Sequence, residues 1–148
     1  MRVYIDTSAL LAILNPHDRV HLPARELWQA LLDTEATLIC SNYVLVETLA
    51  LVQRRMGLEA VQTIVRDIVP VLQVEWVEVD EHWAGVQLLL SLGRRRMSLV
   101  DCVSFVQMRR LGVQEVFAFD EHFESQGFTC LPELLSWFDS STSSQDDA

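Results

Sequence analysis

The sequence contains no lysine: all 11 of its basic residues are arginines, against 21 acidic residues, and its formal net charge is −10. Proteins that bind nucleic acid by surrounding it with positive charge show the opposite balance, because phosphate neutralisation by Lys and Arg supplies most of that affinity. Either the partner is not a polyanion, or the acids gather where they can hold cations.

Long apolar runs are also absent, since none reaches the roughly 18 residues typical of a membrane-spanning helix. The N-terminus is a predicted strand and not a charged segment followed by a leader-like apolar block. We therefore expect a cytoplasmic protein without a membrane partner. The three cysteines, Cys40, Cys102 and Cys130, are odd in number and lie in apolar segments. This pattern favours small buried hydrophobic residues over disulfides or a zinc site.

Half of the 148 residues are apolar, which is typical of one globular domain with a substantial core. Strand-like and helix-like segments alternate along the chain. The expected strands are residues 2–6, 36–41, 74–79, 115–119 and 128–131. The expected helices are residues 8–14, 21–34, 43–56, 58–69, 81–93 and 98–112, with a last one from Pro132 to about Phe138.

Strands separated by helical crossovers indicate an α/β fold of three layers, α/β/α, with a central parallel sheet of four to five strands. We expect one domain over residues 1–138. The tail, residues 139–148, has nothing to bury and is predicted to be disordered.

Two acids stand where apolar strands end. The run RVYI leads directly to Asp6, and EVFAF leads to Asp120. In a parallel α/β sheet the ligand crevice lies outside the carboxyl ends of the strands. We therefore expect Asp6 and Asp120, from opposite ends of the chain, to meet at one edge of the sheet.

Two further acids lie in apolar surroundings. Glu47 is within NYVLVETLAL, and Asp101 lies between SLV and CVSFV, whereas a solvated acid on a helix normally has polar neighbours at i±3 and i±4. Each has an alternative interpretation. Glu47 could belong to a narrow polar stripe with Gln53 and Arg54, and Asp101 could be a first-turn acid that favours a helix N-terminus.

If the four acids converge, their repulsion is large. Two carboxylates about 4 Å apart repel by roughly 4 kcal/mol at an effective dielectric near 20, against a domain stability of about 5–15 kcal/mol. Such a cluster must take up protons or bind cations. With carboxylate oxygens and no His or Cys at ligand spacing, the expected cation is Mg²⁺ or Mn²⁺, which suits phosphate chemistry.

The segments IDTSALLAIL, SNYVLVETLALVQRR and SLVDCVSFVQMRRLGVQEVFAFDEHFESQGF resemble, in order and spacing, the PIN-domain ribonucleases. The resemblance is closest to the VapC-like toxins of type II toxin–antitoxin systems, and it extends to about Leu131. It implies a PIN-like α/β/α fold and a Mg²⁺-dependent endoribonuclease that hydrolyses RNA phosphodiester bonds with a metal-bound water. It also implies a homodimer and an antitoxin whose C-terminal segment covers the active site.

By the same resemblance Asp6, Glu47, Asp101 and Asp120 are the metal-binding acids, and Ser8 is the hydroxyl that supports the site. Asp6 and Asp101 would ligate a first metal, while Glu47 and Asp120 would complete its shell or hold a weaker second ion. Ser8 is also a candidate for the N-cap of the first helix, and the two roles are compatible.

Three neighbouring features are less decisive. Thr7 is interpreted as a helix-capping residue. His122 departs from the family pattern, because many relatives have a second acid there, although Glu121 and Glu124 are near in sequence. The run 94–96 is the only dense basic segment, and it suits either a solvated loop or a phosphate contact near the metal.

The four tryptophans are expected in the core or at a subunit interface; they are Trp28, Trp76, Trp83 and Trp137.

Other functions remain open on the sequence. A solitary PIN-domain nuclease that processes RNA would have the same acids, and a catalytically silent PIN-fold interaction module could also retain them. A phosphoacceptor receiver domain also has acids at strand ends. However, it would be expected to have paired acids after its first strand and a lysine late in the sheet.

Overall fold

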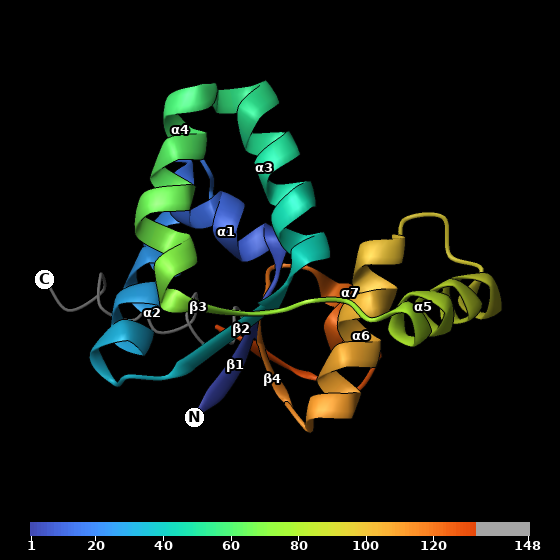
Figure 1. Ribbon diagram of the computed structural model, residues 1–148. Helices are drawn as coiled ribbons and strands as arrows, with labels where there is room; N and C mark the ends of the chain where they lie inside the picture. The colour runs from blue at the N-terminus through green and yellow to red at the C-terminus, as the bar shows by residue number, and fades with distance from the viewer. Residues whose placement is uncertain (133–148) are drawn as a thin grey trace, which may run out of the picture.

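A computed structural model describes residues 1–132; the helix and tail predicted after Pro132 lie outside the described residues. The strands are β1 (Arg2–Ile5), β2 (Thr37–Ser41), β3 (Leu72–Glu75), β4 (Glu115–Phe117) and β5 (Thr129–Leu131). The helices are α1 (Thr7–Leu14), α2 (His21–Asp33), α3 (Asn42–Met56), α4 (Leu58–Thr63), α5 (Val79–Leu92), α6 (Leu99–Leu111) and α7 (Glu121–Ser125). A π-helical turn (Ile64–Ile68) and a 3₁₀ turn (Val69–Val71) connect α4 to β3 (Figure 1).

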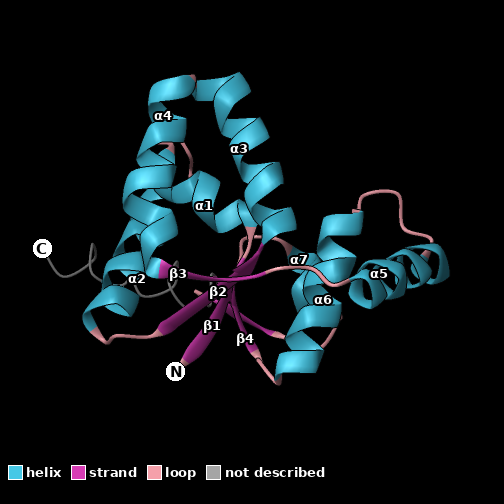
Figure 2. Cartoon of the chain, viewed as in Figure 1, coloured by secondary structure: helices cyan, strands magenta, loops and turns pink. Residues whose placement is uncertain are grey.

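All five strands are parallel, in the order β3-β2-β1-β4-β5. The central strand is β1, where Tyr4 lies opposite Ile39 of β2 and Val116 of β4. Figure 2 shows helices on both sides of the strands. The predicted α/β/α architecture is therefore confirmed, with the carboxyl ends of all strands at one edge and the end of β1 in the middle of that edge.

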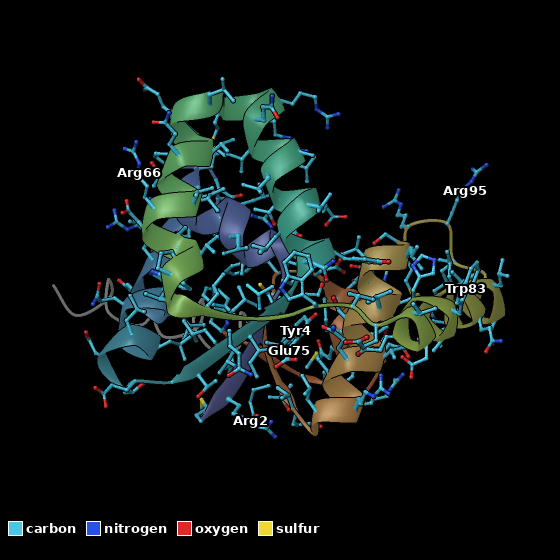
Figure 3. The ribbon with its side chains drawn as sticks, in the orientation of Figure 1. Arg2, Tyr4, Arg66, Glu75, Trp83 and Arg95 are labelled. Atoms are coloured by element: carbon cyan, nitrogen blue, oxygen red, sulfur yellow. The ribbon has the colours of Figure 1, made fainter. Side chains whose placement is uncertain are left out.

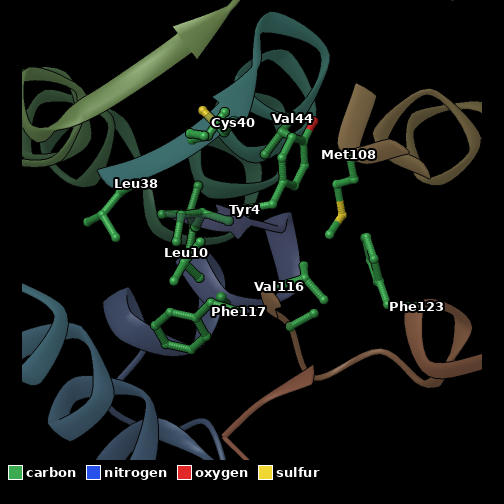
Figure 4. Packing of buried hydrophobic residues seen from close by; sticks show 14 of the residues in the cluster. Tyr4, Leu10, Leu38, Cys40, Val44, Met108, Val116, Phe117 and Phe123 are labelled. Atoms are coloured by element: carbon green, nitrogen blue, oxygen red, sulfur yellow. The ribbon is translucent and has the colours of Figure 1, made fainter. Parts of the chain in front are cut away.

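The core surrounds β1, because this strand is covered on both faces and its side chains cannot alternate between core and solvent. Val3, Tyr4 and Ile5 are fully buried, and Figure 4 shows Tyr4 among side chains from α1, α3, α6 and β4. The Tyr4 hydroxyl donates to Gln107 Oε1 (3.0 Å), and Gln107 Nε2 donates to the Glu75 carbonyl (3.1 Å). Tyr4 and Glu75 are labelled beside the strands in Figure 3. These bonds satisfy buried polar groups and join α6 to β1 and β3.

The third strand is shorter and earlier than predicted. It ends at Glu75, and the alternating segment that follows leaves the sheet and enters α5 at Val79. The cause is a side chain, because Asn42 Oδ1 accepts a hydrogen bond from the Val77 backbone N–H (2.7 Å). The N-cap of α3 is Ser41, whose Oγ accepts from the Val44 N–H (3.1 Å).

Cys40 and Cys102 are buried and free, as expected, whereas Cys130 is free but only partly buried. Among the helices of residues 1–132, none has both the length and the apolar composition needed to cross a membrane.

Candidate active site

Asp6 lies at the middle of the carboxyl edge and is only 3% exposed. Its backbone N–H donates to the Phe117 carbonyl (3.1 Å), which fixes the end of β1 beside β4. Its side chain is the N-cap of α1, because Oδ2 accepts from the Ser8 backbone N–H (3.1 Å). Neither Thr7 nor Ser8 is therefore the capping residue, and Asp6 belongs to both strand and helix.

Ser8 connects two strand ends through its hydroxyl. Its Oγ donates to Asp6 Oδ2 (2.6 Å) and accepts from the Phe119 backbone N–H, just after β4 (3.0 Å). This arrangement orients the Asp6 carboxylate and ties it to the loop that leads to Asp120. The sequence pattern suggested support from Ser8, but only the fold reveals Phe119 as its second partner.

Asp101 occupies the third position of α6 and is 7% exposed. It forms a reciprocal cap with Ser98: the Ser98 N–H donates to Asp101 Oδ2 (3.0 Å), and the Asp101 N–H donates to Ser98 Oγ (3.1 Å). The alternative interpretation of Asp101 as an acid in the first turn of a helix is thus confirmed. Ser98 was missed from the sequence, although S-x-x-D before an apolar run is the pattern of such a cap.

Glu47 lies one turn into α3 and is half-buried. Burial raises the pKa of Glu47, and the neighbouring Thr7 hydroxyl opposes part of this rise. Thr7 Oγ1 also donates to the Val44 carbonyl (3.5 Å) and accepts from Thr48 Oγ1 (3.3 Å). Thr7 therefore joins α1 to α3 beside Glu47.

Asp120 is the N-cap of α7, a short helix that the sequence analysis did not predict. Its Oδ1 accepts from the His122 backbone N–H (2.9 Å) and lies 3.8 Å from His122 Nε2. His122 is thus placed beside the Asp120 carboxylate.

The four acids share one electrostatic environment. Burial raises the pKa of Asp6 to about 7, and repulsion from Asp101 and Asp120 contributes to the rise. Burial also raises the pKa of Asp101, as does the charge of Asp120, while His122 opposes the rise. Glu47 is affected by Asp101 and Asp120 in the same sense. Acids distant in sequence are therefore close enough in space to oppose one another's ionisation.

Three of these carboxylates use one oxygen locally and leave the other without a hydrogen bond from residues 1–132. The engaged atoms are Asp6 Oδ2, Asp101 Oδ2 and Asp120 Oδ1. Oxygen donors that repel one another are the kind of ligand set that Mg²⁺ prefers. As the side chains stand, no three Asp, Glu, His or Cys residues of the described part of the chain enclose a single ion. The site fits a divalent cation because its ligands are carboxylate oxygens and because these acids repel one another.

An open cavity of about 560 Å³ adjoins Asp120 and Ser8 and extends over α7 to Cys130. A second cavity of about 300 Å³ shares Glu121 and Glu124 with it and is lined by His122 and Arg94. The fold thus places Arg94 near α7. The sequence alone did not distinguish a solvated loop from a phosphate contact for residues 94–96.

The PIN-domain family model matches residues 3–128. The chain belongs to the PIN-domain family. This PIN domain is 35% identical over 127 residues to the 23S rRNA-specific endonuclease VapC20 of Mycobacterium tuberculosis, covering 85% of this chain and 95% of the relative.

Solved structures agree with the family. The crystal structure of M. tuberculosis VapC20, described as a sarcin–ricin loop cleaving toxin, has a TM-score of 0.77 and 34% identity, covering 86% of this chain and 96% of that one. VapBC2 from Rickettsia felis bound to a promoter DNA fragment has a TM-score of 0.66 at 13% identity, covering 88% and 97%. FitAcB from Neisseria gonorrhoeae has a TM-score of 0.64 at 12% identity, covering 88% and 96%. The last two likenesses concern the PIN fold alone.

Proposed function

We propose that this PIN-domain protein is a Mg²⁺-dependent endoribonuclease and the toxin of a toxin–antitoxin pair. The observation that carries the proposal is the shared field of Asp6, Glu47, Asp101 and Asp120 at the carboxyl edge of the sheet. Support also comes from the 35% identity to an endonuclease specific for 23S rRNA. An RNA substrate is compatible with an acidic chain when a bound cation mediates the contact with phosphate.

The residues of this chain would prepare the site before any RNA arrives. Ser8 and Ser98 hold one oxygen each of Asp6 and Asp101 by hydrogen bonds, and the helix start at His122 does the same for Asp120. The remaining oxygens and Glu47 are the proposed metal ligands. Preorganised ligands matter because a loosely held carboxylate positions the cation poorly.

Bound Mg²⁺ or Mn²⁺ would supply Lewis acidity toward the phosphoryl group and a water of lowered pKa, so no Ser, Cys or His nucleophile is required. Ser8, whose hydroxyl faces Asp6 and Phe119, acts in this proposal as a positioning residue.

The proposed partners are an RNA substrate, an antitoxin that covers the acidic edge, and a second copy of the chain, with the cytoplasm as the proposed location. A short open reading frame for a DNA-binding antitoxin is expected beside the gene. A solitary RNA-processing nuclease would lack it.

Cleavage of a synthetic RNA stem-loop with the sarcin–ricin sequence tests the proposed activity. The purified chain is expected to cut this RNA in Mg²⁺ or Mn²⁺ and to stop when EDTA is added in excess. A scrambled RNA of equal length is the control for sequence preference. If the folded protein cuts neither these RNAs nor total cellular RNA with either metal, the chain is a PIN-fold interaction module.

Replacing Ser8 with alanine is expected to lower the rate of RNA cleavage by about 10–100-fold, the usual cost of losing a group that orients a metal ligand. The change removes the hydrogen bonds from Oγ to Asp6 and from Phe119 to Oγ. Ser125→Ala is the matched control, because Ser125 Oγ bonds only the His122 carbonyl (2.8 Å) among residues 1–132. Equal rates for both variants would contradict a positioning role for Ser8.

A further inference from the structure

A further cavity, of about 250 Å³, reaches the carboxyl edge of the sheet from the side of α1. This α1 cavity shares Ser8 and Phe119 with the α7 cavity, which is the one of about 560 Å³ beside Asp120. Along α1 it is lined by Ser8, Leu11 and Asn15, whose i, i+3 and i+7 spacing is that of one helix face. At about 1.5 Å per residue, the α1 cavity extends roughly 10 Å away from the acids.

Phe119 lines both cavities and is half-buried. Its backbone N–H donates to Ser8 Oγ (3.0 Å), and its ring is in edge-to-face contact with the fully buried Phe117 (5.9 Å between ring centroids). The ring is therefore held in place before any ligand binds. An accessible aromatic ring is what proteins use to stack on an unpaired nucleobase. Trp76 and Trp83 are more exposed, at 70% and 59%, but neither of them lines these two cavities.

The two cavities differ in charge. Among residues 1–132, the α7 cavity is lined by three acids and no basic residue; the acids are Asp120, Glu121 and Glu124. The α1 cavity is lined by one acid, Asp18, and by Arg55, an exposed arginine in the last turn of α3. Asp18 Oδ1 already accepts from a backbone N–H (2.9 Å), whereas no carboxylate of residues 1–132 lies within 4 Å of an Arg55 nitrogen. A phosphate without its own cation is therefore favoured in the α1 cavity and repelled by the α7 cavity.

We propose that the α1 cavity binds one unpaired nucleotide of the RNA substrate, next to the phosphodiester bond that is cut, with its base against Phe119 and its phosphate at Arg55. The inference rests on the proposed nuclease function and adds which form of RNA the site selects. A base that stacks on a side chain has to leave its own base pair. The α1 cavity therefore selects RNA that is unpaired beside the cleavage point.

The size of the α1 cavity agrees with a single nucleotide. Its volume of about 250 Å³ is below the roughly 300–1,000 Å³ of pockets that hold drug-sized ligands. Its open end lies at Ser8, which bonds Asp6 Oδ2 (2.6 Å). A nucleotide in the α1 cavity would thus adjoin the carboxylates that are the proposed metal ligands.

Fluorescence anisotropy with a labelled RNA stem-loop of the sarcin–ricin sequence tests the aromatic contact. In the Asp101→Asn background, where the RNA is expected to stay intact, Phe119→Leu should raise the dissociation constant about tenfold or more, because base stacking is lost. Phe119→Trp should stay within about threefold of the parent, since it keeps an aromatic face. The backbone bond from residue 119 to Ser8 is retained in both variants. Trp83→Leu is the matched control, because Trp83 is an exposed aromatic outside both cavities.

The salt dependence of the same binding tests the phosphate contact. Arg55→Gln is expected to weaken binding and to lower the slope of log Kd against log salt concentration by about 0.7, the value for one phosphate of a single strand. Arg54→Gln is the matched control, because Arg54 is exposed in the same helical turn but does not line the α1 cavity. Equal slopes for the two variants would overturn the contact at Arg55.

Cleavage kinetics of folded variants with Asp101 intact separate substrate binding from an indirect effect on the metal site. Phe119→Leu should raise KM for the stem-loop and leave kcat within about twofold of wild type. A fully paired duplex of the same sequence should bind equally to both chains. Wild-type affinity of Phe119→Leu for the stem-loop would overturn the proposal. So would a lower kcat at unchanged KM, because Phe119 would then act only through Ser8. If wild type binds RNA without cutting it, the nuclease proposal fails, and the measured affinities still decide the role of the α1 cavity.

Discussion

Replacing Asp101 with asparagine is expected to lower RNA cleavage at saturating Mg²⁺ by about a thousandfold or more, while the circular-dichroism spectrum stays unchanged. Loss of a metal ligand removes several kcal/mol of transition-state stabilisation, and about 4 kcal/mol corresponds to a factor of a thousand. Asparagine retains an oxygen that can accept from the Ser98 N–H, so the cap of α6 survives. The rate of cleavage of the sarcin–ricin stem-loop measures the effect.

Asp67→Asn is the matched control for this change, because Asp67 is an exposed acid on the π-helical turn. It should leave the rate within about twofold of wild type. A similar fall for both variants would indicate a general effect of charge. Full activity of Asp101→Asn would remove Asp101 from the proposed ligands.

Replacing Asp6 with asparagine is expected to abolish cleavage and, without metal, to stabilise the fold. Burial, with repulsion from Asp101 and Asp120, raises the pKa of Asp6 from 3.8 to about 7. Between these values the folded chain binds more protons than the unfolded chain, so the free energy of unfolding of wild type falls as pH rises from about 4 to 7. The deficit above pH 7 is on the order of 4 kcal/mol, at about 1.4 kcal/mol per pKa unit.

Thermal unfolding at pH 8 in EDTA measures this difference. The variant is expected to melt about 10 °C above wild type, at roughly 2–4 °C per kcal/mol for a chain of this size, and its melting temperature should depend less on pH between 4 and 7. Saturating Mg²⁺ should raise the melting temperature of wild type more than that of the variant, since a bound cation favours the ionised carboxylate. A less stable variant in EDTA would show that Asp6 is mainly a structural cap.

The arrangement of the acids could be predicted because it depends on topology. Once strands and helices alternate, the sheet is parallel, and the residues that end β1 and β4 lie at one edge. Asp6 and Asp120 follow from that rule alone. Glu47 and Asp101 stood out as acids in apolar helices. The fold places Glu47 within reach of the charges of Asp101 and Asp120, and it places Asp101 beside Asp6 and Asp120.

The features that the sequence did not predict have a different cause, because they depend on side chains that meet only after folding. Asn42 bonds the Val77 N–H and ends β3 early, which no alternation in 74–79 reveals. Asp6 caps α1 because the end of β1 directs it there. In α5, Glu81 and Gly85 are buried, whereas Val79, Trp83 and Leu90 are exposed on the opposite side of the helix. Both sets have helical spacing, and periodicity alone cannot tell which of them lies inside.

Sequencing RNA 5′ ends after brief expression of the wild-type chain and of Asp101→Asn tests the central claim most directly. New 5′ ends are expected in ribosomal RNA from cells with the wild-type chain, and they should be missing from cells with an equal amount of the folded variant. The same new ends in both samples would contradict a nuclease that depends on the four acids.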